Sequence, residues 1–257
     1  MFQFKYDSLA LAAPFFVNSS DTFIRSALQG VMGEVWADAP ENPRCARIDL
    51  GDFSFLGGDP TAPAALNLIK GARTIVASCG AGWEEVIAKT LPDARASFRR
   101  ATLKEDYFDR KALQGFAGQL PEGFILAPID EKAYHYCLSL SWARDFCALF
   151  DSWQDFSEKG LGWLIWKDNG ELVAGASSYS SYREGIEIQI ETREDNRRQG
   201  LALCCGAKLI LDCLERGIYP SWDAANPASA TLAEKLGYRL GELYPVWMKE
   251  TMGDDDF

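Results

Sequence analysis

The sequence predicts a mixed α/β (α+β) protein built in two parts, with the boundary near residue 120. Short apolar runs alternate along the chain with segments of helical apolar spacing, which is the pattern of strands and helices that share a core. A cluster of glycines and a proline, at positions 115, 118, 121 and 123, separates two such patterned regions. We therefore expect an N-terminal α/β domain over residues 1–120 and a second domain over residues 121–257.

In the N-terminal half we assign no element to the first sixty residues. Residues 64–70 show helical spacing and are followed by a short apolar run of strand length at 74–79. Residues 83–90 form a second expected helix, and residues 94–100 a second strand. These segments indicate an α/β domain.

The C-terminal half has the clearer patterns. Residues 186–190 form an expected strand, because three isoleucines alternate with Glu187 and Gln189. Asp168-Asn169-Gly170 has the chemistry of a tight hairpin turn, and a long helix over 200–216 ends at Gly217. The other expected elements are strands at 124–129, 162–166, 171–179, 219–224 and 243–249, one or two helices within 131–150, and a helix at 227–236.

Charge and composition exclude several classes of function. The chain has 26 Lys and Arg against 37 Asp and Glu, a formal net charge of −11, which disfavours nucleic acid and anionic membranes as partners. A single histidine, His135, cannot build a site of two or three histidines, and we predict no metal. Seven cysteines without C-x-x-C spacing indicate reduced, buried thiols. We expect neither a signal peptide nor a membrane span, and hence a cytoplasmic protein.

The most informative segment is the loop between the alternating strand and the long helix. A helix start offers unpaired N–H groups and a partial positive charge, which suit a phosphate or pyrophosphate. Between residues 193 and 208, four basic and two acidic side chains leave a local charge of +2. The alternative is a helix whose first turn carries solvated arginines. The predicted anion site comprises Arg197, Arg198, Gln199, Gly200, Leu201 and Ala202.

The order of strand, R-x-x-G-x-A loop, long helix, strand, Asn226 and a helix ending in Leu236-Gly237-Tyr238 resembles the GNAT superfamily of N-acetyltransferases, over roughly residues 121–250. The run from Tyr219 to Asn226, with residues 233–238, also resembles the branch of zwittermicin A resistance acetyltransferases. The resemblance implies a GNAT-like mixed sheet flanked by helices in the C-terminal half. It also makes the N-terminal half, which lacks such a loop, a candidate for a diverged copy of the same fold.

Carried onto this chain, the resemblance implies that acetyl-CoA is the co-substrate and that the loop at 197–202 holds its pyrophosphate. Backbone near Ile190, Glu191 and Thr192 would pair with the pantetheine arm. Asn226 would lie beside that arm, although an Asn-Pro pair is also an ordinary helix cap. Ser229 and Lys235 are further candidates for cofactor contacts.

Acetyl transfer to an amine needs a base, because an alkylamine with a pKa of about 10.4 is almost wholly protonated near pH 7. Glu187 is the first candidate, since the superfamily often uses a carboxylate in the earlier part of this strand, and Glu191 and Asp223 are the others. Each of them could instead be a charge on a polar strand face. The general acid stays unassigned: the position that carries a tyrosine in many superfamily members is Ala233 here, which leaves Tyr219, Tyr238 or water.

These features predict an N-acetyltransferase that moves an acetyl group from acetyl-CoA to a primary amine of a small molecule, by direct attack in a ternary complex. Acidic charge and Trp222 favour a cationic amine, and the resemblance makes antibiotic resistance a candidate role. Two roles stay open for the N-terminal half, namely binding of substrate and formation of a homodimer.

Two other functions compete with this interpretation. Ala233 suggests a non-catalytic sensor that binds acyl-CoA. The turn Gly80-Ala81-Gly82, between a strand and a helix, suggests an NADP-dependent oxidoreductase. Glu84 and Glu85 oppose the second alternative, because they place negative charge where that helix would receive a pyrophosphate.

Overall fold

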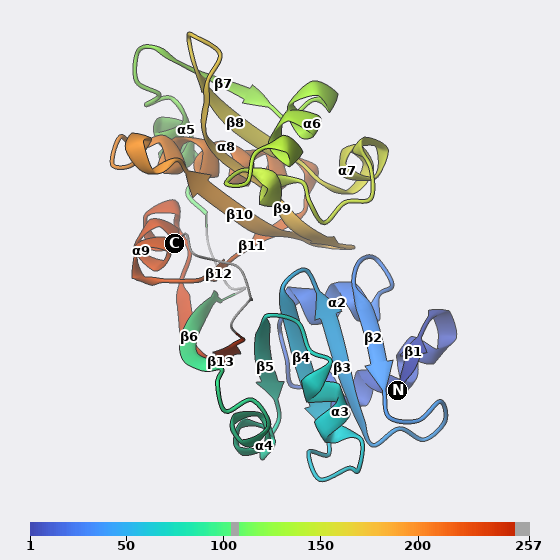
Figure 1. Cartoon of the computed structure of the whole chain (residues 1–257). Helices are drawn as coiled ribbons and strands as arrows, with labels where there is room; N and C mark the ends of the chain where they lie inside the picture. Colours follow the sequence, from blue (N-terminus) through green and yellow to red (C-terminus); the bar gives the residue numbers. More distant parts are fainter. Residues whose placement is uncertain (104–107, 250–257) are drawn as a thin grey trace. The chain divides into compact units, whose positions relative to one another are not determined.

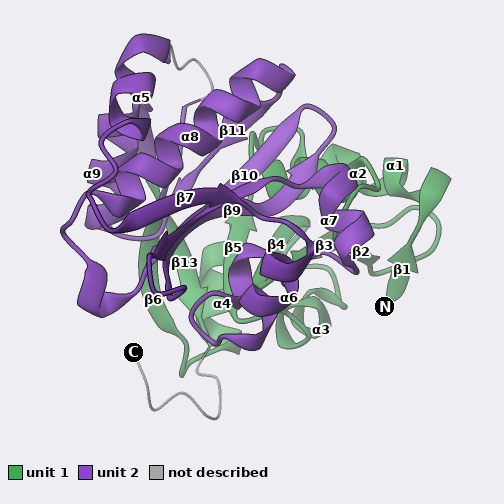
Figure 2. Ribbon diagram, turned by 90° about the horizontal axis from the view of Figure 1, so that it is seen from above, with its two compact units in different colours: residues 1–99, 243–257 green, residues 100–242 purple. Residues whose placement is uncertain are grey.

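The computed structural model describes residues 1–103 and 108–249 and divides the chain into two compact units (Figure 1 and Figure 2). Unit 1 comprises residues 1–99 and the chain from residue 243 onward, and unit 2 comprises residues 100–242. The units therefore differ from the expected domains, which meet near residue 120. The last strand belongs to unit 1 because Val246, Trp247 and Met248 pair with the strand at 75–79.

Unit 1 is built on a mixed sheet in which the first five strands lie side by side in chain order. They are β1 (Phe2–Phe4), β2 (Glu34–Ala37), β3 (Cys45–Leu50), β4 (Phe53–Gly58) and β5 (Ile75–Cys79). Neighbours from β1 to β4 are antiparallel, β4 and β5 are parallel, and β13 (Leu240–Met248) then pairs antiparallel with β5. The helices are η1 (Tyr6–Ser8), α1 (Leu9–Ala12), η2 (Ala13–Phe16), α2 (Thr22–Leu28), α3 (Ala65–Lys70) and α4 (Trp83–Thr90).

Four expected elements of the N-terminal half are confirmed, as α3, β5, α4 and β6 (Arg95–Thr102). The first sixty residues, where no element is assigned from sequence, contain four strands. Strands β3 and β4 are buried on both faces over nearly their whole length, so that apolar and polar residues do not alternate along them. Helix α2 does carry a local signal, because the Asp21 side chain accepts the N–H groups of Phe23 and Ile24 at its start.

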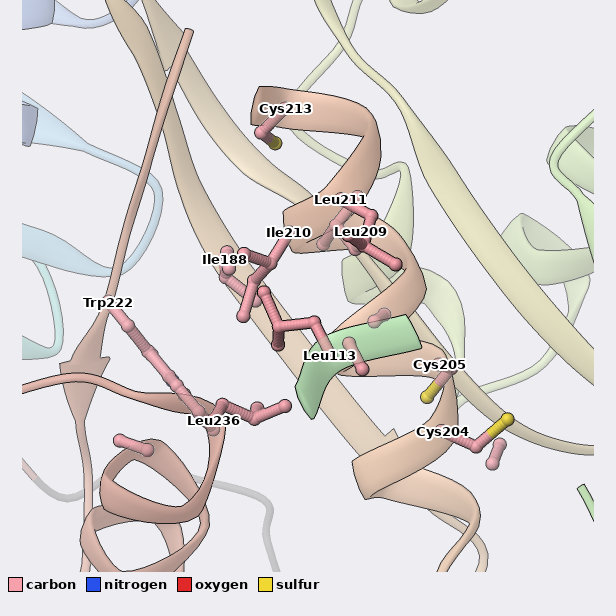
Figure 3. Packing of buried hydrophobic residues seen from close by; sticks show 14 of the residues in the cluster. Leu113, Ile188, Cys204, Cys205, Leu209, Ile210, Leu211, Cys213, Trp222 and Leu236 are labelled. Carbon is pink, nitrogen blue, oxygen red and sulfur yellow. The ribbon is translucent and has the colours of Figure 1, made fainter. Parts of the chain in front are cut away.

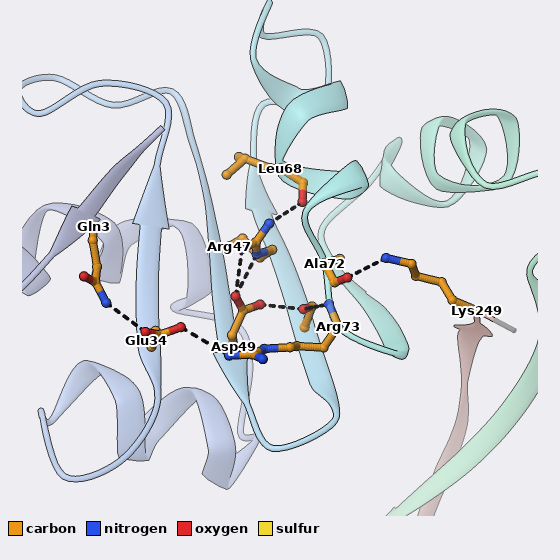
Figure 4. A network of polar contacts seen from close by, with 9 residues as sticks. Gln3, Glu34, Arg47, Asp49, Leu68, Ala72, Arg73 and Lys249 are labelled. Carbon is orange, nitrogen blue, oxygen red and sulfur yellow. Dashed lines mark hydrogen bonds and ion pairs between the residues drawn. The ribbon is translucent and has the colours of Figure 1, made fainter. Parts of the chain in front are cut away.

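A buried polar network joins strands β3 and β4 to α3 in unit 1 (Figure 4). The Arg47 guanidinium pairs with Asp49 at 2.8 Å and donates to the Leu68 carbonyl at 2.7 Å. Ser54 donates to the other oxygen of Asp49 and accepts the Arg73 N–H at 2.8 Å. Arg47 and Asp49 are nearly inaccessible to solvent. This buried charge pair is tolerated because both charged groups have further hydrogen-bond partners, the Leu68 carbonyl for Arg47 and the Ser54 hydroxyl for Asp49.

Replacing Ser54 by alanine is expected to lower the free energy of unfolding by about 1–3 kcal/mol, because it leaves the Arg73 N–H and an Asp49 oxygen without their buried partner. Urea unfolding followed by circular dichroism measures this change. The matched control is Ser157→Ala, which removes an exposed hydroxyl that donates to Gln154. Equal stability of the two variants would contradict the prediction.

Unit 2 contains a second sheet, with strand order β11-β10-β9-β8-β7. The strands of this sheet are β7 (Phe124–Pro128), β8 (Gly162–Lys167), β9 (Leu172–Tyr182), β10 (Gly185–Thr192) and β11 (Tyr219–Ser221). The short β12 (Asp223–Ala224) follows in the chain and pairs with β6 instead. The helices of unit 2 are α5 (Arg110–Ala117), α6 (Glu131–Ser139), η3 (Arg144–Phe146), α7 (Trp153–Lys159), η4 (Glu194–Asn196), α8 (Leu201–Arg216) and α9 (Pro227–Leu236). The expected mixed sheet flanked by helices is confirmed.

The core of unit 2 lies between α8 and the sheet (Figure 3). Leu209, Ile210 and Cys213 of α8 are buried with Ile188 of β10 and Leu113 of α5. Gly115 lies within α5 and Gly118 at its end, and this helix packs on α8. All seven cysteines are free, and six of them are buried, in agreement with the expected reduced thiols.

The two units share an order of elements. In each, four strands are antiparallel neighbours and a helix then leads to a fifth strand that is parallel to the fourth, through α3 in unit 1 and α8 in unit 2. This shared order supports the expectation that the N-terminal part is a diverged copy of the C-terminal one. Over residues 1–103 and 108–249, no helix is both long and apolar enough to span a bilayer.

Candidate active site

Strands β10 and β11 of unit 2 separate after a short stretch of pairing. They are paired in parallel only from Gly185 with Tyr219 to Glu187 with Ser221, whereas β10 continues along β9 to Thr192. The N–H of Arg193 donates to β9 at 2.9 Å. Because N–H groups alternate in direction along a strand, those of Ile190 and Thr192 point to the edge from which β11 has departed. This fork exposes a strand edge that can pair with an extended ligand.

Helix α8 begins beside this edge, at Gly200. Gly200 has a left-handed backbone, with φ of +81°, and Arg198 is also left-handed, with φ of +67°. A Cβ built on Gly200 would meet no atom within 4 Å, and no side chain among the described residues caps the helix. The start of this 16-residue helix therefore has open space beside Gly200 and no cap from a described side chain, and a helix start of this kind can bind an anion.

Side-chain charge around the loop is distributed differently from the sequence expectation of +2. Arg193 is paired with Glu171 and Asp195, and its guanidinium holds the pKa of Asp195 well below the usual range. Lys208 is paired with Asp212 at 2.7 Å. Arg197 lies 3.4 Å from the Glu191 carboxylate, so the positive charge left for a ligand comes mainly from Arg198 and the helix N-terminus. The number of these charged residues follows from the sequence, but the ion pairs that they form do not.

Arg197 and Glu191 hold the loop to the end of β10. Arg197 Nε donates to the Thr192 carbonyl at 3.2 Å and a terminal nitrogen lies 3.4 Å from the Glu191 carboxylate. The same carboxylate accepts the Thr192 N–H at 3.1 Å. These contacts give Glu191 a role in loop structure, so its role as a base stays a prediction. Gln199 is exposed in the loop, while Leu201 is buried beneath the start of α8 and Ala202 is half-buried.

Glu187 lies on the face of β10 opposite α8. The neighbouring residues Ile186 and Ile188 point into the core, so the alternation of a strand turns Glu187 to the other face. Its side chain is only 4% exposed, and it stands at the last paired position before the fork. Asp223 lies instead on β12, where its register partner is Ala101. Of the three predicted carboxylates, Glu187 has the position that best suits a base at the fork.

Of the three cofactor residues predicted at α9, Asn226 and Ser229 lie at its start and Lys235 at its end. The Asn226 side chain accepts the Ser229 N–H at 2.9 Å, with Pro227 in the first turn, so the alternative of a helix cap is what the structure shows. Lys235 lies in the last turn, about 13 Å along the helix axis from Asn226. Cofactor contacts by these three residues stay predictions.

The two tyrosines considered as general acids are both bonded to backbone. Tyr238 is buried and donates to the Pro220 carbonyl at 2.6 Å, and Tyr219 donates to the Leu103 carbonyl at 3.0 Å. Ala233 is buried in the core of unit 2. Trp222, expected near a cationic substrate, is also buried in that core, edge-on to Tyr238. Acid catalysis by either tyrosine and a cation contact by Trp222 stay predictions.

The glycine turn of unit 1 has a structural role. Gly82 begins α4 with a left-handed backbone, and the following Trp83 donates its indole N–H to the Gly58 carbonyl at 3.0 Å. Glu84 and Glu85 occupy the first turn of α4, as expected, and Glu85 pairs with Lys89. Nothing in this turn favours a dinucleotide.

Comparison with known proteins gives the class that this fork and loop define. The family model described as GNAT acetyltransferase matches residues 13–247. The chain therefore belongs to the GNAT acetyltransferase family, a family of acyltransferase enzymes. The match begins in unit 1, whereas the sequence resemblance was confined to roughly residues 121–250, so both units belong to the family.

The individual relatives agree with this assignment. The chain is 29% identical over 240 residues to the uncharacterized N-acetyltransferase YdfB of Bacillus subtilis (strain 168), covering 88% of this chain and 89% of that protein. A crystal structure of a GCN5-related N-acetyltransferase-like protein from Streptococcus suis 89/1591 is 38% identical, with a TM-score of 0.90 over 95% of this chain and 99% of that one. A tandem GNAT protein from the clavulanic acid biosynthesis pathway shares the fold, at 13% identity and a TM-score of 0.53, over 87% of this chain and 84% of that one.

Proposed function

We propose that unit 2 binds acetyl-CoA and transfers its acetyl group to a primary amine of a small molecule, by direct attack in a ternary complex. The observation that carries this proposal is the fork between β10 and β11 beside the uncapped start of α8. The fork offers backbone amides at the edge of β10, and the start of α8 offers N–H groups. The short segment between Thr192 and Leu201 joins these two groups of donors.

The residues of this segment suit the parts of acetyl-CoA. The N–H groups of Leu201 and Ala202, with Arg198, would hold the pyrophosphate. The strand edge at Ile190 would pair with an amide of the pantetheine arm. The Thr192 N–H would do so in place of its bond to the Glu191 carboxylate. The Thr192 hydroxyl is buried and has no hydrogen-bond partner among the described residues, as expected of a group that awaits a ligand.

The counterpart of the fork in unit 1 is closed. Strands β4 and β5 are paired over five positions, from Phe53 to Gly57 on β4. A Cβ built on Gly57 would lie 2.8 Å from the Phe16 ring, so aromatic side chains fill the space beside the end of β4. Hydrogen bonds from Thr61 and Arg44 lower the pKa of Asp59 to about 2, which leaves an anion in the loop before α3. Asp59 is paired with Arg44, so this pair leaves no net positive charge to attract a phosphate.

We accordingly expect one acetyl-CoA site per chain. Isothermal titration calorimetry of the full chain with acetyl-CoA should give a stoichiometry of one, because the fork is open in unit 2 and its counterpart in unit 1 is closed. A stoichiometry of two would contradict the closed state of unit 1. The matched control titration uses dephosphorylated pantetheine, which lacks the pyrophosphate and should bind more weakly at the same site.

The acceptor is proposed to be a cationic amine. Buried Glu187 would take a proton from the ammonium form, so that the neutral nitrogen can attack the thioester carbonyl. The sequence resemblance to the zwittermicin A resistance branch adds an aminopolyol antibiotic as a candidate substrate and resistance as a candidate role. The direct assay measures release of free thiol from acetyl-CoA with putrescine, 2-aminoethanol, tyramine, glucosamine and zwittermicin A.

The outcomes of this assay separate the candidate functions. Thiol release that depends on one of the amines supports the transferase. Binding of acetyl-CoA without turnover of any amine supports a sensor, which is favoured by the bonding of both Tyr219 and Tyr238 to backbone carbonyls. Failure to bind acetyl-CoA would reject both.

A further inference from the structure

Strand β9 carries four serines, and one of them differs from the others in its bonding. Three donate to backbone carbonyls, namely Ser177 to Phe146 at 2.7 Å, Ser178 to Leu161 at 3.1 Å and Ser181 to Lys159 at 2.7 Å. Ser180 is only 1% exposed, yet its hydroxyl has no hydrogen-bond partner among the described residues. Buried hydroxyls are nearly always bonded, so this one calls for a partner beyond those that residues 1–103 and 108–249 supply.

An irregularity in the sheet places this hydroxyl. Ser178 is the register partner of Ile188 and Ser180 is the partner of Glu187, so that Tyr179 is an extra residue on β9. Such a bulge turns the side chains on either side of it and is frequent next to active sites. As a result, Ser180 stands directly opposite Glu187 and on the same face of the sheet.

The bulge lies level with the fork. Glu187 is paired with Ser180 on one side and with Ser221 on the other, at the last position where β10 and β11 are joined. Side chains directly opposite each other in antiparallel strands have Cβ atoms about 4.5–5.5 Å apart. A nitrogen or oxygen atom of a ligand that contacts the Glu187 carboxylate is therefore within reach of the Ser180 hydroxyl.

We infer that Ser180 is a positioning residue that holds the acceptor nitrogen beside Glu187; this inference rests on the proposed acetyl transfer. One N–H of the ammonium group is directed to Glu187 and another to the Ser180 oxygen, which accepts it. The ammonium gives one proton to Glu187, and the lone pair of the neutral amine forms the C–N bond to the acetyl carbon. The C–S bond breaks, and the thiolate leaves with its electron pair. The second proton lost by nitrogen protonates the thiolate, either directly or through water.

The test compares Ser180→Ala with Ser178→Ala in the full chain, using acetyl-CoA and the best amine of the panel above. Ser178 is the matched control, because its hydroxyl accepts from and donates to Leu161 and so has a purely structural partner. We expect Ser180→Ala to lower kcat/KM for the amine roughly tenfold, mainly through a higher KM, because one hydrogen bond to a charged group is lost. Its Kd for acetyl-CoA and its melting temperature should match those of the wild type.

Ser178→Ala should show the opposite signature, namely a lower melting temperature with kcat/KM close to that of the wild type below that temperature. A Ser180→Ala variant with unchanged kcat/KM and KM would overturn the inference while the proposed function stands. So would one with reduced melting temperature and weakened acetyl-CoA binding, because those changes indicate a structural role. Absence of acetyl-CoA binding or of amine turnover by the wild type would overturn the proposed transferase, and the inference with it.

Discussion

Replacing Gly200 by glutamate is expected to raise the Kd for acetyl-CoA about 100-fold or more, with the fold retained. The new carboxylate would lie at the positive end of α8, where it competes with the pyrophosphate for the exposed N–H groups. Loss of two charge-assisted hydrogen bonds is sufficient for a change of this size. The left-handed backbone adds a cost of about 1–2 kcal/mol to folding, but a Cβ meets open space there, so the protein should still fold. Calorimetry gives the affinity and thermal unfolding gives the stability.

Gly217 offers a matched control at the other end of the same helix. It is also left-handed, with φ of +69°, and a Cβ built on it also meets no atom within 4 Å. Gly217→Glu therefore carries a similar backbone cost and the same added charge, but it lies at the C-terminus of α8. We expect lower stability and unchanged affinity for acetyl-CoA. If the two glutamate variants bind acetyl-CoA with equal affinity, the start of α8 is not part of the binding site.

Replacing Glu187 by glutamine is expected to lower kcat/KM by about 10² to 10⁴ near neutral pH, which is the usual contribution of a positioned base. The substitution keeps the size of a side chain that is only 4% exposed, so the change should act on chemistry more than on packing. The loss should shrink as the pH is raised. Below the pKa of the amine, each increase of one pH unit raises the concentration of neutral amine in solution about tenfold. Rates of thiol release between pH 6 and pH 9 measure both effects.

Glu191→Gln is the control for this substitution, because Glu191 lies on the same face of β10 but is bonded to the Thr192 N–H and close to Arg197. We expect it to weaken acetyl-CoA binding modestly through the loop and to keep the shape of the pH–rate profile. A profile of Glu187→Gln that parallels the wild type at every pH would exclude Glu187 as the base.

Features that depend on neighbours in sequence could be predicted well. The alternation from Ile186 to Ile190 indicated a strand with one polar face, and the glycine before a long apolar segment indicated the start of α8. The family resemblance likewise rests on short motifs, the R-x-x-G-x-A loop and the run from Tyr219 to Asn226, and on their order along the chain. In contrast, strands β3 and β4 are buried on both faces and carry no alternation, and the glycine cluster that indicated a domain boundary includes Gly115, which lies inside α5.

Pairing across the chain could not be obtained from these local patterns. The sequence contains the charges of Arg193, Lys208 and Arg197, but only the structure shows that each has an acidic partner, so that the helix start and Arg198 are left for an anion. It contains four serines on β9, but only the register with β10 distinguishes Ser180 from the others. The assignment of the last strand to unit 1 depends in the same way on hydrogen bonds to β5, more than 160 residues earlier.

The candidate site thus has two origins. Its loop and its strand follow from the sequence, because hydrophobic period, turn chemistry and helix termini are set by residues that lie within a few positions of one another. Its first candidate base, Glu187, follows from the family resemblance. The opening of the fork, the isolation of the Ser180 hydroxyl and the closure of the equivalent region in unit 1 depend on tertiary structure. They depend on which strands pair and over how many residues, and this pairing is determined by burial and hydrogen bonding between segments far apart in the chain.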